Sequence, residues 1–152
     1  MEKIETELRI QNRSNRTINM YIFFNEKFID FINKKVNEVN GDDVKKFFAY
    51  LISKKNYSAS SINLVRSALS FFYDFILKNN IVKEIKAPKI TRDLPEIVTK
   101  EEIKLMLNNC GKLRDKLLIS LMYASGLRVS ECTNLKWSNL DLEDKTGLLK
   151  RG

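Results

Sequence analysis

Both prolines of the 152-residue sequence, Pro88 and Pro95, lie in one short stretch. Proline lacks a backbone donor and biases the residue before it away from helical dihedrals. Between residues 83 and 95 the apolar residues show no helical period, and basic residues alternate with the prolines. We therefore predict a basic, extended linker over residues 83–95, which separates a domain of residues 1–82 from one of residues 96–152.

The first domain is predicted to be a bundle of four helices, because its apolar residues recur at steps of three and four. The clearest pattern runs from Ile62 to Ile76, and an aromatic stripe runs from Tyr21 to Phe31. Such stripes are more often core than ligand-binding surface, so we assign both to the core. The expected helices span residues 2–11, 14–33, 42–55 and 58–78.

The charge of the chain is positive and unevenly distributed. Lys and Arg number 27 against 19 Asp and Glu, a net charge of +8, and 16 of the basic but only 10 of the acidic residues lie in residues 1–90. This balance suits a polyanionic partner, with nucleic acid favoured over a membrane surface. Charge alone fits a basic protein without such a partner equally well.

Two groups of polar residues in the first domain are candidate contacts to a DNA backbone. One lies where the second helix begins, and the other follows the polar side of the fourth helix. Helix N-termini, basic side chains and hydroxyls commonly donate to phosphate. Ordinary capping and a solvated surface explain the same residues, and that alternative stays open. The candidates are Arg13, Asn15, Arg16, Thr17, Ser58, Ser60, Ser61, Asn63, Arg66, Ser67 and, in the linker, Lys89.

The sequence contains no histidine and two cysteines, Cys110 and Cys132. Histidine-based metal sites and His-dependent acid–base schemes are therefore excluded within these residues, and neither cysteine has the spacing of a zinc site. We expect both thiols to be small buried groups in a reducing compartment, and we expect no metal or cofactor. Without a signal peptide or an apolar run of membrane length, we expect a cytoplasmic protein that does not enter a membrane.

The second domain is expected to begin with a helix capped by Thr99, whose hydroxyl can form a reciprocal capping box with Glu102. The next helix is nearly all apolar over residues 117–124, and such a segment is expected to be deeply buried. Gly126 is the expected left-handed C-cap of that helix. Trp137 is expected to pack behind the short helix that follows.

Arg128 stands alone between the end of one expected helix and the start of the next. A guanidinium is planar, permanently charged and forked, so an arginine fixed at a turn is suited to grip a phosphate. Residues 140–142 and 148–150 are expected to form two strands joined by a turn. A sheet of two strands is marginal by itself, so we expect an incomplete domain.

Three segments of this second part carry a resemblance to a known family. They are Leu94-Pro95 before Thr99-Lys-Glu-Glu-Ile, the run LMYASGLRVSE that ends at Glu131, and Asn134-Leu-Lys-Trp137 with Leu140-Asp141. Together they resemble the opening of the catalytic domain of tyrosine recombinases, the phage-integrase family, in its Xer-like branch. The basic helical segment before it is similar to the core-binding domain of that family. The resemblance implies a mainly α protein, with a helical SAM-like core-binding domain followed by a truncated α+β catalytic domain of tyrosine-recombinase type.

In that family two domains clamp duplex DNA, and a tyrosine attacks the scissile phosphate without metal to leave a 3′-phosphotyrosyl link. The resemblance implies that Arg128 stabilises the charged transition state and that Glu131 orients Arg128. The nucleophile and the other catalytic positions have no counterpart in residues 1–152, and Lys150 is not assigned to one. We therefore expect no DNA cleavage by this chain alone, and interpret it as a fragment of a longer recombinase or a truncated gene product. The resemblance also implies a tetramer on DNA for the complete enzyme, whereas we expect this fragment to be a monomer in solution.

Three functions stay open at this point. The chain is the N-terminal, DNA-binding part of a site-specific recombinase or integrase, a non-catalytic DNA-binding fragment that modulates recombination, or a helical protein-interaction module. The first predicts a further arginine and a tyrosine downstream, and the second needs only salt-dependent DNA binding. The third predicts a protein complex that survives high salt.

Overall fold

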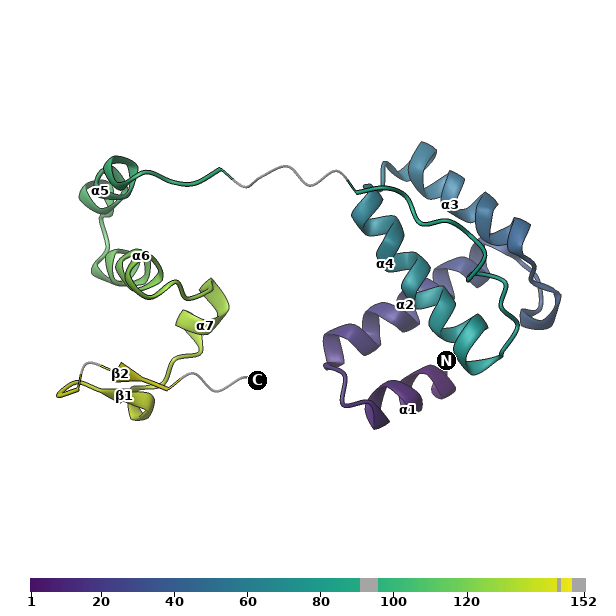
Figure 1. The fold of residues 1–152 in the computed structure, drawn as a ribbon, viewed down its shortest axis with the longest axis horizontal. Coiled ribbons are helices and arrows are strands. Elements are labelled where there is room, and N and C mark those ends of the chain that lie inside the picture. The colour runs from purple at the N-terminus through teal and green to yellow at the C-terminus, as the bar shows by residue number, and fades with distance from the viewer. Residues whose placement is uncertain (91–95, 145, 149–152) are drawn as a thin grey trace. The chain divides into compact units, whose positions relative to one another are not determined.

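The computed structural model describes residues 1–90, 96–144 and 146–148, and the chain divides into two compact units, Met1–Asp93 and Leu94–Gly152 (Figure 1). Within the described residues, unit 1 is entirely helical, and unit 2 combines helices with one small antiparallel sheet. The mainly α fold class expected from the sequence is confirmed. Residues 91–95 of the expected linker and Lys150 of the expected second strand lie outside the described residues.

Unit 1 contains the four expected helices, and local side chains explain where they begin and end. Ser14, Asn40 and Ser58 each accept a hydrogen bond from backbone N–H groups of the following first turn. Asn33 and Asn56 end their helices in the left-handed conformation, with φ of 49° and 53°. The elements are α1 (Glu2–Ile10), α2 (Asn15–Ile32), the 3₁₀ turn η1 (Val36–Glu38), α3 (Gly41–Lys55), α4 (Ala59–Ser70) and η2 (Phe71–Ile76).

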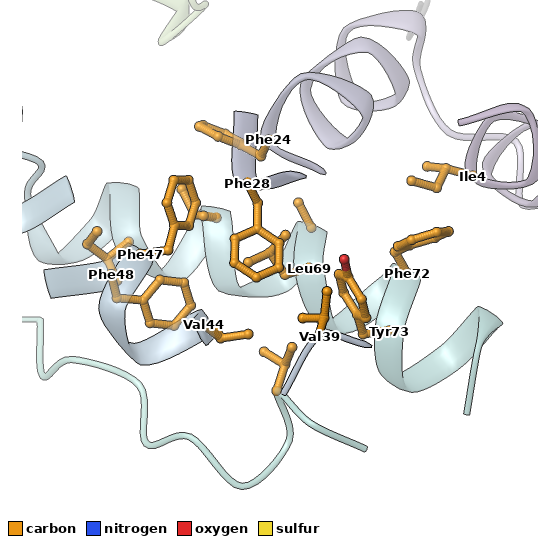
Figure 2. Close-up of a cluster of buried hydrophobic side chains, with 14 of the residues drawn as sticks. Ile4, Phe24, Phe28, Val39, Val44, Phe47, Phe48, Leu69, Phe72 and Tyr73 are labelled. Carbon is orange, nitrogen blue, oxygen red and sulfur yellow. The ribbon is translucent and has the colours of Figure 1, made fainter. Parts of the chain in front are cut away.

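The core of unit 1 forms between α2, α3 and the continuous helix of α4 and η2 (Figure 2). Figure 2 shows Phe28 of α2 between Phe47 of α3 and Tyr73 of η2, and all three side chains are fully buried. The ring centroid of Phe28 lies 5.2 Å from that of Phe47 and 5.8 Å from that of Tyr73. Aromatic pairs at these separations add to the stability gained from burial alone.

The aromatic stripe of α2 is core at its centre and exposed at its end. Phe24 and Phe28 are buried, Tyr21 is half-buried, and Phe31 is exposed. The assignment of the stripe to the core is therefore confirmed for its central part. Phe31 lies at the last turn of the helix, where it stacks on Tyr50 at 4.8 Å between ring centroids.

The fourth helix changes its hydrogen-bond pattern at Phe71, where α4 gives way to the π-helical turn η2. The N–H of Leu77 donates to the carbonyl of Phe72, five residues earlier, at 3.0 Å. Two consecutive residues, Phe72 and Tyr73, are buried in this wider turn. The sequence predicted a continuous helix here, but a run as apolar as Phe71–Leu77 does not distinguish an α turn from a π turn.

Residues 82–88, here called the strap, follow η2 and lie against unit 1. Val82 is fully buried, and Ile85 is half-buried against the core. Asp74 accepts a hydrogen bond from the N–H of Val82 at 3.0 Å and another from the hydroxyl of Ser70 at 2.7 Å. Residues 83–88, which the sequence places in an extended linker, are therefore packed on the first unit.

Unit 2 shows the two local signals expected at its helix ends. Thr99 and Glu102 form the capping box, with the Thr99 N–H 2.8 Å from Glu102 Oε2 and the Glu102 N–H 3.2 Å from Thr99 Oγ1. The Thr99 hydroxyl also donates to Glu102 Oε2, at 2.9 Å. The bond from the Thr99 N–H, with that from its hydroxyl, holds the pKa of the Glu102 carboxyl below its ordinary value. Gly126 has φ of 66° and ends the second helix. The elements are α5 (Lys100–Asn109), α6 (Leu113–Ser125), α7 (Val129–Thr133), the 3₁₀ turn η3 (Trp137–Asn139), β1 (Leu140–Asp141) and β2 (Thr146–Gly147).

The sheet pairs Leu140 with Gly147 and Asp141 with Thr146 in antiparallel register. The second strand was expected over residues 148–150, so the described pairing begins earlier in the sequence than predicted. The Asp141 carboxylate accepts the N–H groups of Glu143 and Asp144, both at 3.0 Å, and so shapes the turn between the strands.

The expected deep burial of α6 is wrong for the residues that the structure describes. Leu117 is 64% exposed, and Trp137, which was expected to pack behind α7, is 74% exposed. Of the two cysteines, Cys132 is buried as expected, but Cys110 is only half-buried. The physical reason is that α6 packs on α5 and α7, which are both shorter and cannot cover every side of an apolar helix.

Candidate nucleic-acid interface

The first group of candidate contacts lies at the junction of α1 and α2. A left-handed residue follows α1, and the N–H of Arg13 donates to a carbonyl of α1 at 3.0 Å. Ser14 Oγ then accepts the N–H of Thr17 at 3.3 Å and lies 3.0 Å from the Thr17 hydroxyl. Arg13, Asn15 and Arg16 are exposed, and Thr17 is half-buried. The junction therefore presents two guanidinium groups beside the open N–H groups of a helix start.

The second group begins at α4 and repeats this arrangement. Ser58 Oγ accepts the N–H of Ser61 at 3.2 Å and lies 3.0 Å from the Ser61 hydroxyl. Ser58 and Ser60 are exposed, and Ser61 is half-buried. Each of the two helix starts thus combines a serine cap with a second hydroxyl one turn later. Among the described residues, no hydrogen bond or ion pair joins the group at α2 to the group at α4.

The starts of α2 and α4 also differ in charge from the other described α-helices. The first turns of α1, α3, α5, α6 and α7 each contain an acidic residue. The first turns of α2 and α4 contain none. A carboxylate at this place neutralises the partial positive charge of a helix N-terminus. At α2 and α4 that charge is not neutralised within the first turn, which favours an approaching anion such as a phosphate.

Two α4 residues of the second group bind the strap. Arg66 donates from Nε to the carbonyl of Ile85 at 2.9 Å and from Nη2 to the carbonyl of Lys83 at 3.3 Å. Asn63 donates from Nδ2 to the carbonyl of Pro88 at 3.2 Å. Sequence reasoning missed these contacts, because a hydrogen bond to a distant backbone carbonyl leaves no pattern in either segment.

Ser67, the last residue of the second group, and Lys89, which follows the strap, are both exposed. The Ser67 hydroxyl donates to the carbonyl of Asn63 at 2.9 Å, within its own helix. An open hollow of about 590 Å³ is lined by residues that include Gln11, Ser67 and Lys83. It therefore lies where the end of α1, the side of α4 and the strap meet. Lys89 directly follows the strap residue that Asn63 holds.

Arg128 lies in unit 2, between the end of α6 and the start of α7. Its backbone N–H donates to Glu131 Oε2 at 2.7 Å, and its Nη1 donates to Glu131 Oε1 at 3.1 Å. One carboxylate thus binds both the backbone and the guanidinium of the same residue. The Arg128 side chain is 82% exposed. An ion pair this exposed is worth at most about 1 kcal/mol, so the guanidinium can also engage an incoming phosphate.

The five tyrosines have different environments. Tyr73 is fully buried, and Tyr21, Tyr50 and Tyr57 are partly buried against the core of unit 1. Tyr123 on α6 is exposed. Burial raises the pKa of Tyr73 to about 12, so its hydroxyl is protonated at neutral pH.

The described ranges contain neither a metal-binding cluster nor a membrane-spanning helix. Over residues 1–90, 96–144 and 146–148, no group of three or more Cys, Asp or Glu is placed to hold a metal ion. None of the helices in those ranges combines the length and the apolar character needed to cross a bilayer.

Both units match known domain families. Residues 1–83 match "Phage integrase, N-terminal SAM-like domain", and residues 96–152 match "Phage integrase family". The tyrosine recombinase XerA of Pyrococcus horikoshii is 36% identical over 152 residues, which are 100% of this chain and 51% of the relative. The tyrosine recombinase XerC of Natranaerobius thermophilus is 34% identical over 137 residues, covering 84% of this chain and 44% of the relative.

A solved structure described as "Crystal structure of XerA recombinase" matches with a TM-score of 0.52 and 27% sequence identity. The match covers 99% of this chain and 54% of that chain. This chain therefore spans about half the length of the relatives it matches. The comparisons confirm the expected SAM-like helical domain in unit 1 and match the described part of unit 2 to the phage integrase family. The chain belongs to the phage integrase family and is similar over its whole length to Xer tyrosine recombinases.

Proposed function

We propose that this chain binds duplex DNA as the N-terminal part of a site-specific tyrosine recombinase or integrase. The observation that carries the proposal is the pair of helix starts at α2 and α4, which combine hydroxyl caps with first turns free of carboxylates. Such N-termini donate to phosphate oxygens without reading sequence. Residues 1–90 also hold the surplus of Lys and Arg, which supports attraction to a polyanion.

In this proposal the backbone contacts come from the two helix starts and from the basic segment after the strap. Arg13, Arg16 and Lys89 supply the charge, and all three are exposed. Hydroxyl and amide donors come from Asn15, Thr17, Ser58, Ser60, Ser61 and Ser67. Contacts of this kind set orientation and affinity, so the target sequence is read elsewhere.

Arg128 is the proposed catalytic residue of the chain. An exposed guanidinium whose fork is oriented by a carboxylate suits a transition state that gathers negative charge on non-bridging phosphate oxygens. Glu131 is the positioning residue, because it holds both the backbone and the side chain of Arg128. The proposed chemistry uses no metal or cofactor.

We propose that residues 1–152 alone bind DNA without breaking it. None of the five tyrosines lies in a segment that resembles the nucleophile region of the family. Strand cleavage then requires catalytic residues in the half of the relatives that this chain does not span. We also place the protein in the cytoplasm, as a monomer when free and as part of a tetramer on DNA in the complete enzyme.

A second role, binding to another protein chain, is favoured by one observation. Apolar side chains of unit 2 are exposed on α5, α6 and η3, including Leu105, Leu117 and Trp137. Exposed apolar side chains that gather in one patch are typical of an interaction site. A complex formed through it would survive high salt, whereas DNA binding would not.

Fluorescence anisotropy of a labelled random duplex tests the DNA-binding proposal. The affinity of the whole chain is expected to fall steeply with salt. Arg16→Gln should lower the slope of log affinity against log salt by about one, because one phosphate contact is lost. Lys45→Gln is the matched control, since Lys45 is exposed and paired with Asp42 on α3. Equal effects of the two substitutions would show that only net charge matters.

Arg128 is tested in a chimera that joins this chain to the C-terminal half of the Pyrococcus horikoshii XerA. Arg128→Ala is expected to abolish covalent attachment to a nicked duplex, while most DNA binding persists. Arg114→Ala, which removes another exposed arginine of unit 2, is the control and should retain attachment. Near-normal attachment by the Arg128→Ala chimera would contradict the catalytic role.

A further inference from the structure

The polar side of the fourth helix is occupied by the strap. Asn63, Arg66, Ser70 and Asp74 recur at steps of three and four, so they lie on one side of α4 and η2. Three of these four side chains bind strap backbone directly, at Pro88, at Ile85 and Lys83, and at Val82. The fourth, Ser70, donates to Asp74. The side chains therefore form a continuous row that holds residues 82–88.

The hydrogen bonds of Arg66 use the shape of its side chain. Nε and Nη2 lie on one edge of the guanidinium and reach the carbonyls of two strap residues, Ile85 and Lys83. Lysine carries its three donors on one freely rotating nitrogen, so it lacks the two separate, coplanar donor nitrogens that reach these carbonyls. Arg66 is also half-buried, unlike the exposed Arg13 and Arg16. To bind a phosphate through the same edge, Arg66 would have to release the strap.

We propose that Arg66 and Asn63 are positioning residues that hold the strap on unit 1 and so shorten the connection between the two units, in place of the phosphate contact expected from the sequence. This inference rests on the proposed function, because its purpose is to let both units grip one duplex. Held through Pro88, residues 83–88 are removed from the extended connection that the sequence predicts over residues 83–95. A shorter connection raises the effective concentration of one unit near DNA that the other has bound.

The strap also determines where three positively charged side chains lie on the surface of unit 1. Lys83 and Lys86 lie within it, Lys89 follows it, and all three side chains are exposed. Because Arg66 and Asn63 bind backbone carbonyls, they fix the course of the strap without using its lysines. The ammonium groups of the three lysines therefore project from fixed positions on unit 1 and stay available to contact a DNA backbone.

Trypsin cleavage of the whole chain without DNA tests whether Arg66 holds the strap. The enzyme cuts after Lys83 and Lys86 only when the strap opens, so the cleavage rate follows the open fraction. Arg66→Lys keeps the charge but loses the fork, and is expected to raise cleavage at these two sites by about tenfold or more. Arg16→Gln is the control and should leave both rates unchanged. Unchanged rates in Arg66→Lys would overturn the proposal.

The salt dependence of DNA binding separates a positioning role from a phosphate contact. Arg66→Gln should weaken binding while leaving the slope against salt close to that of the unaltered chain, whereas Arg16→Gln lowers it by about one. A drop of about one in Arg66→Gln, with strap cleavage unchanged, would show that Arg66 is a phosphate ligand after all. If the unaltered chain does not bind duplex at low salt, the proposed function fails, but the cleavage assay still decides whether the strap is held.

Asn63→Ala provides a second variant that removes no charge. It is expected to raise cleavage after Lys86, within the strap, severalfold, with circular dichroism unchanged. If Arg66 variants prove unfolded, this substitution carries the test alone. Cleavage at the unaltered rate would then contradict the role of this row of side chains.

Discussion

The two units of this chain bury their apolar residues to very different extents. In unit 1 the helices α2 and α3 and the continuous helix of α4 and η2 surround a core in which aromatic rings of α2, α3 and η2 meet. Phe28, Phe47 and Leu69 are fully buried there. In unit 2 the most apolar helix, α6, has no buried residue in the described structure. An apolar helix is buried only when enough neighbours cover it, so hydrophobicity alone does not decide burial. Unit 1 contains the elements that its core requires, and the described part of unit 2 leaves apolar surface uncovered.

The largest expected effect contrasts a core leucine with a leucine of α6. Leu69→Ala should destabilise unit 1 by about 2–5 kcal/mol, because it leaves a cavity in a packed core. Leu117→Ala, with the side chain 64% exposed, should change stability by less than about 0.5 kcal/mol. Urea unfolding followed by circular dichroism compares the variants. A loss of similar size for Leu117→Ala would show that α6 is covered in solution.

Asp43, a buried carboxylate of unit 1, is expected to make the stability of that unit depend on pH. The Asp43 side chain accepts hydrogen bonds from Lys34 Nζ at 2.8 and 3.0 Å and from the Asn40 N–H at 3.1 Å. The bond from Lys34, with that from Asn40, lowers the pKa of Asp43 from its ordinary value of 3.8. A lowered folded-state pKa adds stability above the unfolded-state pKa, and this stability is lost as the pH falls through the folded-state pKa.

Asp43→Asn should therefore cost about 1–3 kcal/mol near neutral pH, and the difference from the unaltered chain should shrink on acidification. Urea midpoints measured at about pH 7 and about pH 3 provide the comparison. Asp42→Asn is the control, since Asp42 lies in the same first turn but pairs with Lys45 at the surface. A cost for Asp43→Asn that does not vary with pH would contradict this account.

Within unit 2 the expected effect of a backbone change is smaller. Gly126→Ala should lower the stability of unit 2 by about 1 kcal/mol, because Gly126 has φ of 66°, which a residue with a Cβ rarely adopts. The loss should not be larger, since an added Cβ meets no atom within 4 Å. Gly111→Ala is the control, since the space there is equally open and the backbone needs no left-handed conformation. Fluorescence of Trp137, the single tryptophan, reports unfolding of this unit. Equal stabilities of the two variants would mean that the α6 turn is not fixed by its backbone.

The smallest expected effect concerns a buried hydroxyl. Tyr73 Oη is buried and has no hydrogen-bond partner among the described residues. Tyr73→Phe should therefore leave the stability of unit 1 unchanged or raise it by up to about 1 kcal/mol. Tyr57→Phe should lower stability slightly, because the Tyr57 hydroxyl accepts a bond from Lys27 at 2.9 Å. A clear loss in urea unfolding for Tyr73→Phe would show that its hydroxyl is bonded in solution.

Local features of both units were predictable from the sequence, because each depends on residues a few positions apart. The caps at Ser14 and Ser58, the capping box at Thr99 and the left-handed Gly126 all follow from short-range rules. The family was also visible in the GLRVSE segment around Arg128, and the domain matches confirm it. Glu131 lies where its spacing from Arg128 allows it to orient the guanidinium.

Features that depend on distant segments could not be predicted. The strap contacts of Arg66 join residues 17 and 19 positions apart through a side chain and backbone carbonyls, which no periodicity records. The exposure of α6 depends on which helices are present to cover it. The sequence therefore predicted the candidate DNA contacts without distinguishing among them. In the structure, Asn63 and Arg66 hold the strap, whereas others such as Arg13 and Arg16 are exposed to solvent.

Hydrogen–deuterium exchange of the whole chain, with and without a random duplex, tests most directly whether unit 1 grips DNA through its helix starts. We expect slower exchange in peptides covering residues 13–18 and 58–63 when DNA is bound, because phosphates occupy the open N–H groups there. Exchange at residues 41–46, where Asp42 and Asp43 already occupy the start of α3, should not change. Protection by DNA that is confined to residues 96–148, or no protection by DNA at low salt, would contradict the assignment of the DNA-binding surface to unit 1.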